Sequence, residues 1–166
     1  IETWDFTSAT PLVGIIRGVI LTGNNLTFDS SGAIFTAATD CILLGAVPRG
    51  NFSFEVDVAS MNLAALGDHQ RFVMGSADGG LIYRSTSHQW EFYGNGNWAT
   101  SSGEGAGDFF SGATVRCVVD SDWYWHIYKD GVLWYEPTRP QTLSSVRIGS
   151  DSSSIRNAVI SAFRWL

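Results

Sequence analysis

Aromatic and polar side chains are interleaved along the stretch from Gln89 to Trp98. Proteins bind sugars by stacking the apolar face of the sugar ring on an aromatic side chain, while carboxylate, amide and guanidinium groups bond to the hydroxyls. Because the stretch supplies both kinds of group, it predicts a carbohydrate-binding surface. An alternative for Trp98 is a ring that caps the rim of the fold. The residues expected to stack are Trp98, Trp90 and Tyr93, and those expected to bond to hydroxyls are Asn95, Asn97, Asp78 and Arg84.

A second set of candidates lies beside the dipeptide Asp130-Gly131. Asp-Gly between two runs of alternating side-chain character, each typical of a strand, predicts a hairpin with a two-residue type I′ turn. Both residues of such a turn adopt positive φ. The pairing that follows places Ile127 opposite Trp134 and His126 opposite Tyr135. The face with Trp134 is the more apolar, so we assign it to the core together with Trp125. The other face carries Tyr128 and adds three glycan-binding candidates, which are Tyr124, His126 and Tyr135.

Acidic residues in turn-like sequences raise the question of a calcium site. Asp78, Asp120, Asp122 and Asp151 would supply the hard oxygens that calcium prefers. Asp is also common in turns because its side chain bonds to nearby backbone groups, and the spacing of a calcium-binding loop is absent. Calcium therefore stays an open expectation, and no other cofactor is indicated. No histidine stands in a motif with a nucleophile, so no catalytic residue is predicted.

Composition excludes several classes of partner. The chain has 166 residues, a net charge of −6 and ten dispersed Lys and Arg residues. A surface that binds phosphates needs clustered cations, so a nucleic acid is not expected. No window approaches about 18 uninterrupted apolar residues, so membrane insertion is not expected either. The two cysteines, Cys41 and Cys117, are either free thiols in the core or one disulfide formed in an oxidising compartment.

The elements that must position these residues are strands. Phe52, Phe54, Val56 and Val58 alternate with polar residues, which is the period of a half-buried strand. A short helical turn is expected only at Ser60–Gly67, and a long loop at Gly94–Gly107. Similar runs between turn residues predict further strands at Thr3–Thr7, Asn25–Asp29, Ala33–Thr36, Asp40–Gly45, Arg71–Ser76, Gly80–Ser85, Gln89–Tyr93, Thr114–Asp120, Trp123–Lys129, Val132–Glu136, Val146–Gly149 and Ala158–Leu166.

About a dozen short strands in one domain, residues 1–166, predict an all-β fold of two packed sheets. The strand-like segments at the two ends are expected to pair. The apolar segment Pro11–Leu21 is interpreted as a buried strand, or alternatively as a subunit contact. If Val115, Cys117 and Val119 also face the core, the connection Ser121–Trp123 must have three residues, because a two-residue turn would place Cys117 on the His126 face.

Several segments, taken in order, carry a family resemblance. Tyr128–Leu133 reads YKDGVL, Trp4–Phe6 reads WDF, and Ala158–Leu166 contains FRW. With Phe52–Ser60 as a long central strand, this order resembles the concanavalin A-like lectin/glucanase superfamily, in particular its laminin-G-like and pentraxin-like members. The resemblance covers nearly the whole chain. It implies a jelly-roll sandwich of two antiparallel sheets with six or seven strands each, and it fixes no function by itself.

Glucanases of that superfamily carry a strand of the form Glu-x-Asp-x-Glu or Glu-x-Asp-x-x-Glu. Glu55-Val56-Asp57 matches the first two carboxylates, but Ala59 and Ser60 stand where the third belongs. A retaining glycosidase needs two carboxyl groups about 5–5.5 Å apart across the scissile bond, and the acid/base residue is missing. The sequence therefore predicts a protein that is not an enzyme, in which the acidic pair faces solvent and meets an arginine from a neighbouring strand.

Three functions fit these observations. The first is a non-catalytic, lectin-like module that binds a cell-surface glycan or polysaccharide. The second is a structural or adhesion domain of a virion, such as a tail fibre, spike or capsid decoration, and the third is a laminin-G-like protein-binding module. The acidic net charge and the single lysine, Lys129, favour an extracellular or virion-surface location, in a homo-oligomer or a larger surface assembly. Aromatic side chains aligned in a groove would favour sugar, whereas a flat apolar patch would favour assembly.

Overall fold

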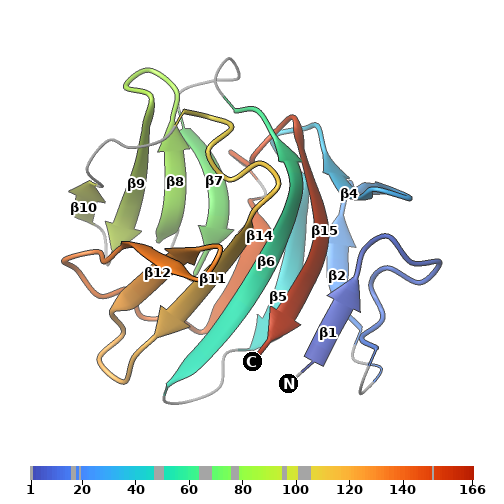
Figure 1. Ribbon diagram of the computed structural model, residues 1–166, viewed down its shortest axis with the longest axis horizontal. Helices are drawn as coiled ribbons and strands as arrows, with labels where there is room; N and C mark the ends of the chain where they lie inside the picture. The colour runs from blue at the N-terminus through green and yellow to red at the C-terminus, as the bar shows by residue number, and fades with distance from the viewer. Residues whose placement is uncertain are drawn as a thin grey trace.

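The computed structural model describes the chain except for residues 1, 16, 17, 19, 47–50, 64–68, 76–78, 95, 96, 101–105 and 151, and except for the side chains of 46 and 97–100. Within the described residues, all the regular secondary structure is β-strand, and the strands form two antiparallel sheets packed face to face (Figure 1). The predicted all-β sandwich is therefore confirmed. No helix in this part of the chain is long and apolar enough to cross a membrane.

The larger sheet contains eight of the described strands, in the order β13-β12-β11-β6-β15-β4-β3, and β1 pairs with the C-terminal part of β15. The expected pairing between the first and last strands is therefore confirmed, and Figure 1 shows β1 beside β15. The strands of this sheet are β1 (Glu2–Asp5), β3 (Thr27–Asp29), β4 (Gly32–Phe35), β6 (Phe52–Met61), β11 (Thr114–Val119), β12 (Trp125–Lys129), β13 (Val132–Tyr135) and β15 (Ala158–Trp165).

The second sheet contains the other seven described strands, in the order β10-β9-β8-β7-β14-β5-β2. Figure 1 shows β6 and β15 crossing in front of β14 and β5, with β10 at the far edge. The strands of this sheet are β2 (Thr22–Asn24), β5 (Cys41–Ala46), β7 (His69–Met74), β8 (Gly80–Arg84), β9 (Gln89–Gly94), β10 (Asn97–Thr100) and β14 (Ser145–Gly149).

The core lies between the sheets and is rich in aromatic rings. In β6, Phe54 and Val56 are buried and alternate with half-buried polar residues, as the period of two predicts. Phe54 packs edge-on against Trp125 at a ring-centroid distance of 6.1 Å, and Trp4 lies 5.5 Å from Phe163. The ring of Phe163 also lies 6.0 Å from that of Phe54, so these contacts join both ends of the chain to the middle strands.

The turn at Asp130-Gly131 has the predicted conformation, with φ values of +49° and +79°. Tyr128 pairs with Leu133 as expected, but a bulge follows, and Ile127 pairs with Tyr135 instead of Trp134. The expected register is therefore wrong beyond the first two pairs. A bulge places two residues of one strand opposite one residue of its partner, so Trp134 and Tyr135 both lie on the side of Ile127.

The connection between β11 and β12 agrees with the three-residue alternative. Val119 pairs with Trp125 and Cys117 pairs with Ile127, and all four side chains are buried. The backbone N–H of Asp120 donates to the carbonyl oxygen of Tyr124 at 3.1 Å, which leaves residues 121–123 as the connection. Cys117 therefore faces the core, and Cys41 and Cys117 are not joined in a disulfide.

Several predicted segments differ from the structure. Within Pro11–Leu21, Val13, Ile15 and Ile20 are exposed, and Val13 and Ile20 form an isolated bridge instead of a strand, so the buried-strand interpretation is wrong there. The expected helical turn is wrong at Ser60–Met61, because β6 continues through Met61; residues 64–67 lie outside the described part. The strands β2 and β10 were not predicted, because three or four residues are too few to show a period.

Candidate functional site

Trp90 lies in the core and cannot stack on a ligand. Its ring is 0% exposed and packs 4.7 Å from Phe110 and 5.2 Å from Tyr83, measured between ring centroids. The alternation of β9 turns Trp90 and Phe92 toward the facing sheet, and both belong to the core cluster. The prediction that Trp90 binds a sugar is therefore wrong, because neither face of the indole reaches solvent.

Two of the other predicted residues lie on neighbouring strands but at opposite ends of the pairing, because Arg84 pairs with Gln89 and Tyr93 pairs with Gly80. Arg84 ends β8 and Tyr93 lies on β9, and both are half-buried. Arg84 forms an ion pair with Glu91 at 3.3 Å, and its Nε–H donates to Nε2 of His69 at 3.1 Å. Glu91 is only 2% exposed, so the Arg84 charge neutralises a carboxylate that would be costly to bury alone.

The remaining residues of this set are described only in part. Asp78 and Asn95 lie outside the described residues. Asn97 and Trp98 belong to β10, of which the backbone alone is described, and Trp98 pairs with Tyr93. Trp98 therefore has a strand partner, which its Gly- and Asn-rich surroundings did not indicate. Whether its ring binds a sugar stays a prediction.

The second predicted set is divided by the bulge. Tyr124 is 38% exposed. His126 lies between two carboxylates, with Nδ1 2.7 Å from Glu136 and Nε2 3.6 Å from Asp120. Tyr135 does not join them, because it lies opposite Ile127 and packs against the core. Burial, and then the charge of Glu91, raise the pKa of Tyr135 above its ordinary value of 10.0.

The acidic pair on β6 takes part in an ion-pair network. Arg164 of β15 contacts Glu55 at 3.4 Å and also pairs with Asp57. The hydroxyl of Thr114 donates to the Asp57 carboxylate at 2.8 Å. The hydrogen bonds to Asp57 are the main reason why the pKa of Arg164 is raised above its ordinary value. The expected contact with an arginine is confirmed, and it joins β6 to β15 across the sheet.

Asp120, one of the aspartates considered for calcium, has backbone partners. One carboxylate oxygen of Asp120 accepts the backbone N–H groups of Asp122 and Tyr124, at 2.9 and 3.0 Å. This is the usual role of Asp in a turn. Among the described residues, no group of three His, Cys, Asp or Glu side chains is arranged to hold a metal ion. Asp78 and Asp151 lie outside that part of the chain, and calcium stays a prediction.

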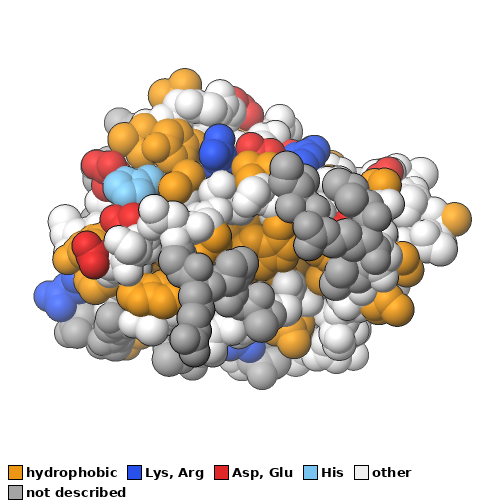
Figure 2. Space-filling view, turned by 90° about the horizontal axis from the view of Figure 1, so that it is seen from below, with side chains coloured by type: hydrophobic (Ala, Val, Ile, Leu, Met, Phe, Trp, Pro, Cys, Tyr) orange, Lys and Arg blue, Asp and Glu red, His pale blue; other side chains and the backbone are white. Residues whose placement is uncertain are grey.

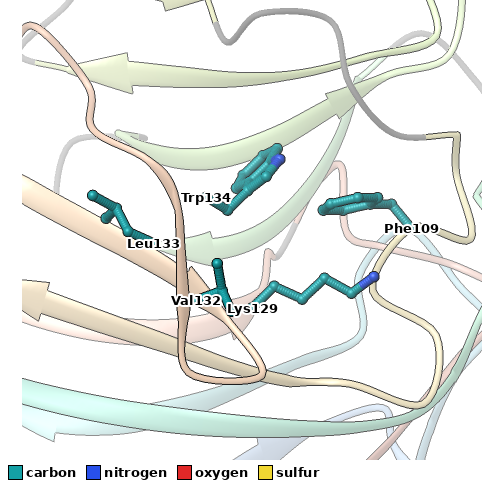
Figure 3. Close-up of a pocket in the computed structure, with 5 residues that line it drawn as sticks. All are labelled: Phe109, Lys129, Val132, Leu133 and Trp134. Atoms are coloured by element: carbon teal, nitrogen blue, oxygen red, sulfur yellow. The ribbon is translucent and has the colours of Figure 1, made fainter.

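A hollow beside β13 contains aromatic groups that the sequence analysis did not select. We name it the aromatic hollow; its volume is about 300 Å³, and it is lined by Phe109, Lys129, Val132, Leu133 and Trp134 (Figure 3). The rings of Phe109 and Trp134 lie 5.2 Å apart at 39° to each other. Figure 3 shows the Lys129 side chain extending toward Phe109, and its Nζ lies 4.2 Å from the centre of that ring.

The aromatic hollow is supported from below by the core. The ring of the fully buried Phe110 lies 5.2 Å from Trp134 and 4.9 Å from Phe109, edge-on to both. Trp134 and Phe109 are themselves half-buried and line the hollow, so part of each side chain stays accessible. The apolar run Val132–Tyr135 breaks the alternation expected of a strand, and this was the available signal for the site.

No protein-family model and no curated protein sequence matches the chain. Solved structures do match over 99% of it. They include a Trypanosoma rangeli sialidase in complex with sialic acid, at a TM-score of 0.70 and 15% identity. They also include the botulinum neurotoxin serotype D binding domain, at a TM-score of 0.63 and 14% identity. A third is the botulinum neurotoxin serotype D ligand binding domain in complex with N-acetylneuraminic acid, at a TM-score of 0.58 and 14% identity.

The fold is a jelly-roll β-sandwich. At these identities the likeness concerns the fold alone. The chain spans 30% of the sialidase and 46% of each toxin structure. The activities of those whole proteins are therefore not transferred by the match, and the function has to be argued from the surface of this chain.

Proposed function

We propose that this chain is a non-catalytic carbohydrate-binding module of concanavalin A-like type, located outside the cell or on a virion, with the aromatic hollow as its site. The observation that carries the proposal is the arrangement of Phe109 and Trp134. These two half-buried rings are held at a fixed angle by the core and have an accessible hollow beside them. A sugar ring can stack there without reorganising the protein.

Rigidity is the physical advantage of this site. Binding a sugar costs the freedom of the groups that become ordered, so a platform already fixed by packing loses less. Phe110 fixes both rings, as described above. The volume of about 300 Å³ is at the lower end of the range for small-molecule pockets, which suits a short part of a glycan, such as a terminal sugar.

Other observations support the class of ligand. Two of the similar structures are described as complexes with sialic acid or N-acetylneuraminic acid, so this fold accompanies sugar binding in other proteins. Figure 2 shows Lys and Arg side chains scattered among acidic and apolar ones on the face that it draws, which does not favour a nucleic acid. The ion pairs of Glu55 and Asp57 with Arg164 commit those carboxylates to structure, which supports a role without catalysis.

The test is a glycan and bacterial-polysaccharide array probed with the purified chain on a multivalent carrier, because single sites of this kind bind weakly. We expect specific binding that falls at least tenfold in Trp134→Ala and in Phe109→Ala. Trp165→Ala, which removes a half-buried tryptophan from β15, is the matched control and should bind as the unaltered protein does. Circular dichroism checks that each variant is folded.

Two results would contradict the proposal. If the folded protein binds no glycan on either array, the carbohydrate-binding function is wrong. If glycans bind but the Trp134 and Phe109 variants bind equally well, the function stands and the aromatic hollow is the wrong site. Arrays run with calcium and with a chelator test the calcium expectation in the same experiment.

One observation favours a second function, that of an assembly module. Val13, Ile15 and Ile20 expose apolar side chains near the edge strand β1, and Ile15 donates its backbone N–H to the carbonyl oxygen of Thr3 at 2.8 Å. Exposed apolar side chains that lie together are typical of protein contacts. The two functions are compatible, because an oligomer would present several glycan sites at once.

A further inference from the structure

Lys129 contributes the charge of the aromatic hollow. It is the only lysine in a chain of net charge −6. Its ammonium lies over the Phe109 ring, and among the described residues no carboxylate lies within ion-pair distance of it. The other four residues that line the hollow are apolar or aromatic. Among the described residues, the lining therefore carries a single charge, and that charge is positive.

The nearest acidic residues along the sequence are engaged elsewhere. Asp130 follows Lys129, but its carboxylate accepts the backbone N–H of Thr114 at 2.9 Å. Asp108 precedes Phe109, and its charge acts on the hydroxyl of Tyr83, where it adds to the effect of burial in raising the pKa. Neither residue lines the hollow. Among the described residues that line the hollow, the ammonium of Lys129 is therefore the one charged group.

A cation beside two aromatic rings can contact two parts of one ligand. The ring of a sugar would stack on Trp134, and a negative group on that sugar would reach the ammonium of Lys129. Contact with Phe109 holds the ammonium near its ring, and the apolar walls reduce the screening of its charge by water. A neutral sugar would gain the stacking but could offer the ammonium only a hydroxyl.

We propose that the aromatic hollow selects glycans whose terminal sugar carries a negative charge, through an ion pair with Lys129. This inference rests on the proposed function and names its ligand class. These glycans share an anionic group on a pyranose ring. The group is either a carboxylate, as in glucuronic acid or a sialic acid, or a sulfate ester.

The test compares glycans that differ only in charge, at 50 mM and at 500 mM NaCl. The probes are glycans ending in glucuronate, in N-acetylneuraminate or in a 6-sulfated galactose, with the uncharged glucose and galactose glycans on the same linker as references. We expect the charged probes to bind at least tenfold more tightly at low salt. The preference should shrink at high salt, because ions screen the pair.

Substitutions test whether the preference for charged glycans comes from the ammonium of Lys129. Lys129→Met keeps most of the length of the side chain and removes its charge, so it should abolish the preference and leave the weaker binding of neutral glycans. Lys129→Arg should retain the preference. Trp134→Ala should lose binding of both kinds. The comparison of carboxylated with sulfated probes decides which anionic group the hollow takes.

Failure of the inference and failure of the proposed function are distinguishable. If neutral and charged probes bind equally, or if Lys129→Met keeps the preference, the charge selection is wrong while the glycan-binding function stands. If no probe binds the folded, unaltered protein, the proposed function fails and the selection fails with it. Binding of charged probes that is unchanged in Trp134→Ala would place the anion site elsewhere.

Discussion

Three ionisable side chains have raised pKa values in the folded protein, and this makes its stability depend on pH. Cys117 is fully buried, and burial alone raises the pKa of its thiol above the ordinary value of 9.0. Burial is also the first cause of the raised pKa values of Tyr83 and Tyr135, and the charges of Asp108 and Glu91 add to it. All three groups are therefore favoured in their neutral forms when the protein is folded.

The chain should lose stability in alkaline solution. As the pH rises through about 9, the Cys117 thiol ionises in the unfolded chain but stays protonated in the folded one, so the free energy of unfolding falls by up to about 1.4 kcal/mol per pH unit. The tyrosines add to this above about pH 10. Urea unfolding between pH 7 and 10.5 measures the slope, and Cys117→Ala should reduce it between pH 9 and 10. Cys41→Ala is the control for the loss of a thiol, and equal slopes in the two variants would contradict the prediction.

At the scale of elements, two hairpins of the larger sheet depend on glycine for different reasons. Gly131 has a φ of +79° in the turn between β12 and β13, and a Cβ there would meet nothing within 4 Å. Gly32 has a φ of +132° at the start of β4, and its Cβ would overlap the carbonyl oxygen of Ile160 on β15. Position 131 therefore requires glycine only for its backbone conformation. Position 32 requires glycine also because a side chain would not fit between the strands.

Alanine substitutions separate these two requirements. Gly131→Ala should lower the free energy of unfolding by about 1 kcal/mol, because only the backbone conformation is strained. Gly32→Ala should lower it by about 3 kcal/mol or more, since neither backbone can move without breaking the pairing of β4 with β15. Chemical denaturation of both variants gives the two values. Equal losses would show that the contact with Ile160 is relieved at no cost.

At the scale of the whole molecule, the exposed apolar side chains near β1 bear on the oligomeric state. Ile15 and Ile20 are 65% and 74% exposed. If this surface joins copies of the chain, Ile15→Ser combined with Ile20→Ser should shift sedimentation toward the monomer and weaken binding to multivalent glycans. Val132→Ser, which alters another exposed apolar residue, is the control for sedimentation. A chain that sediments as a monomer at every concentration, with or without the substitutions, would contradict the self-association.

The sequence by itself determined the class of fold. The period of two at Phe52–Val58 predicted a strand, and the turn residues between many short runs predicted a sandwich of strands. Asp130-Gly131 predicted a hairpin turn. All three signals reflect local geometry, which the sequence contains. The three-residue connection after Asp120 followed from requiring Cys117 and Ile127 to face the same side. That the acidic pair meets an arginine of a neighbouring strand followed from its place on the exposed face of a strand, and the structure identifies this arginine as Arg164.

Only the tertiary structure decided which aromatic residues are accessible. Alternation divides a strand into two faces, but it does not say which face the second sheet covers, and Trp90 therefore belonged to the core while Trp134 lay at its edge. The bulge that moved Trp134 and Tyr135 arises from pairing between strands, which one strand's sequence does not contain. The aromatic hollow needs Phe109 and Lys129 from different segments, and these meet because β11, which follows Phe109, pairs with β12, which ends at Lys129.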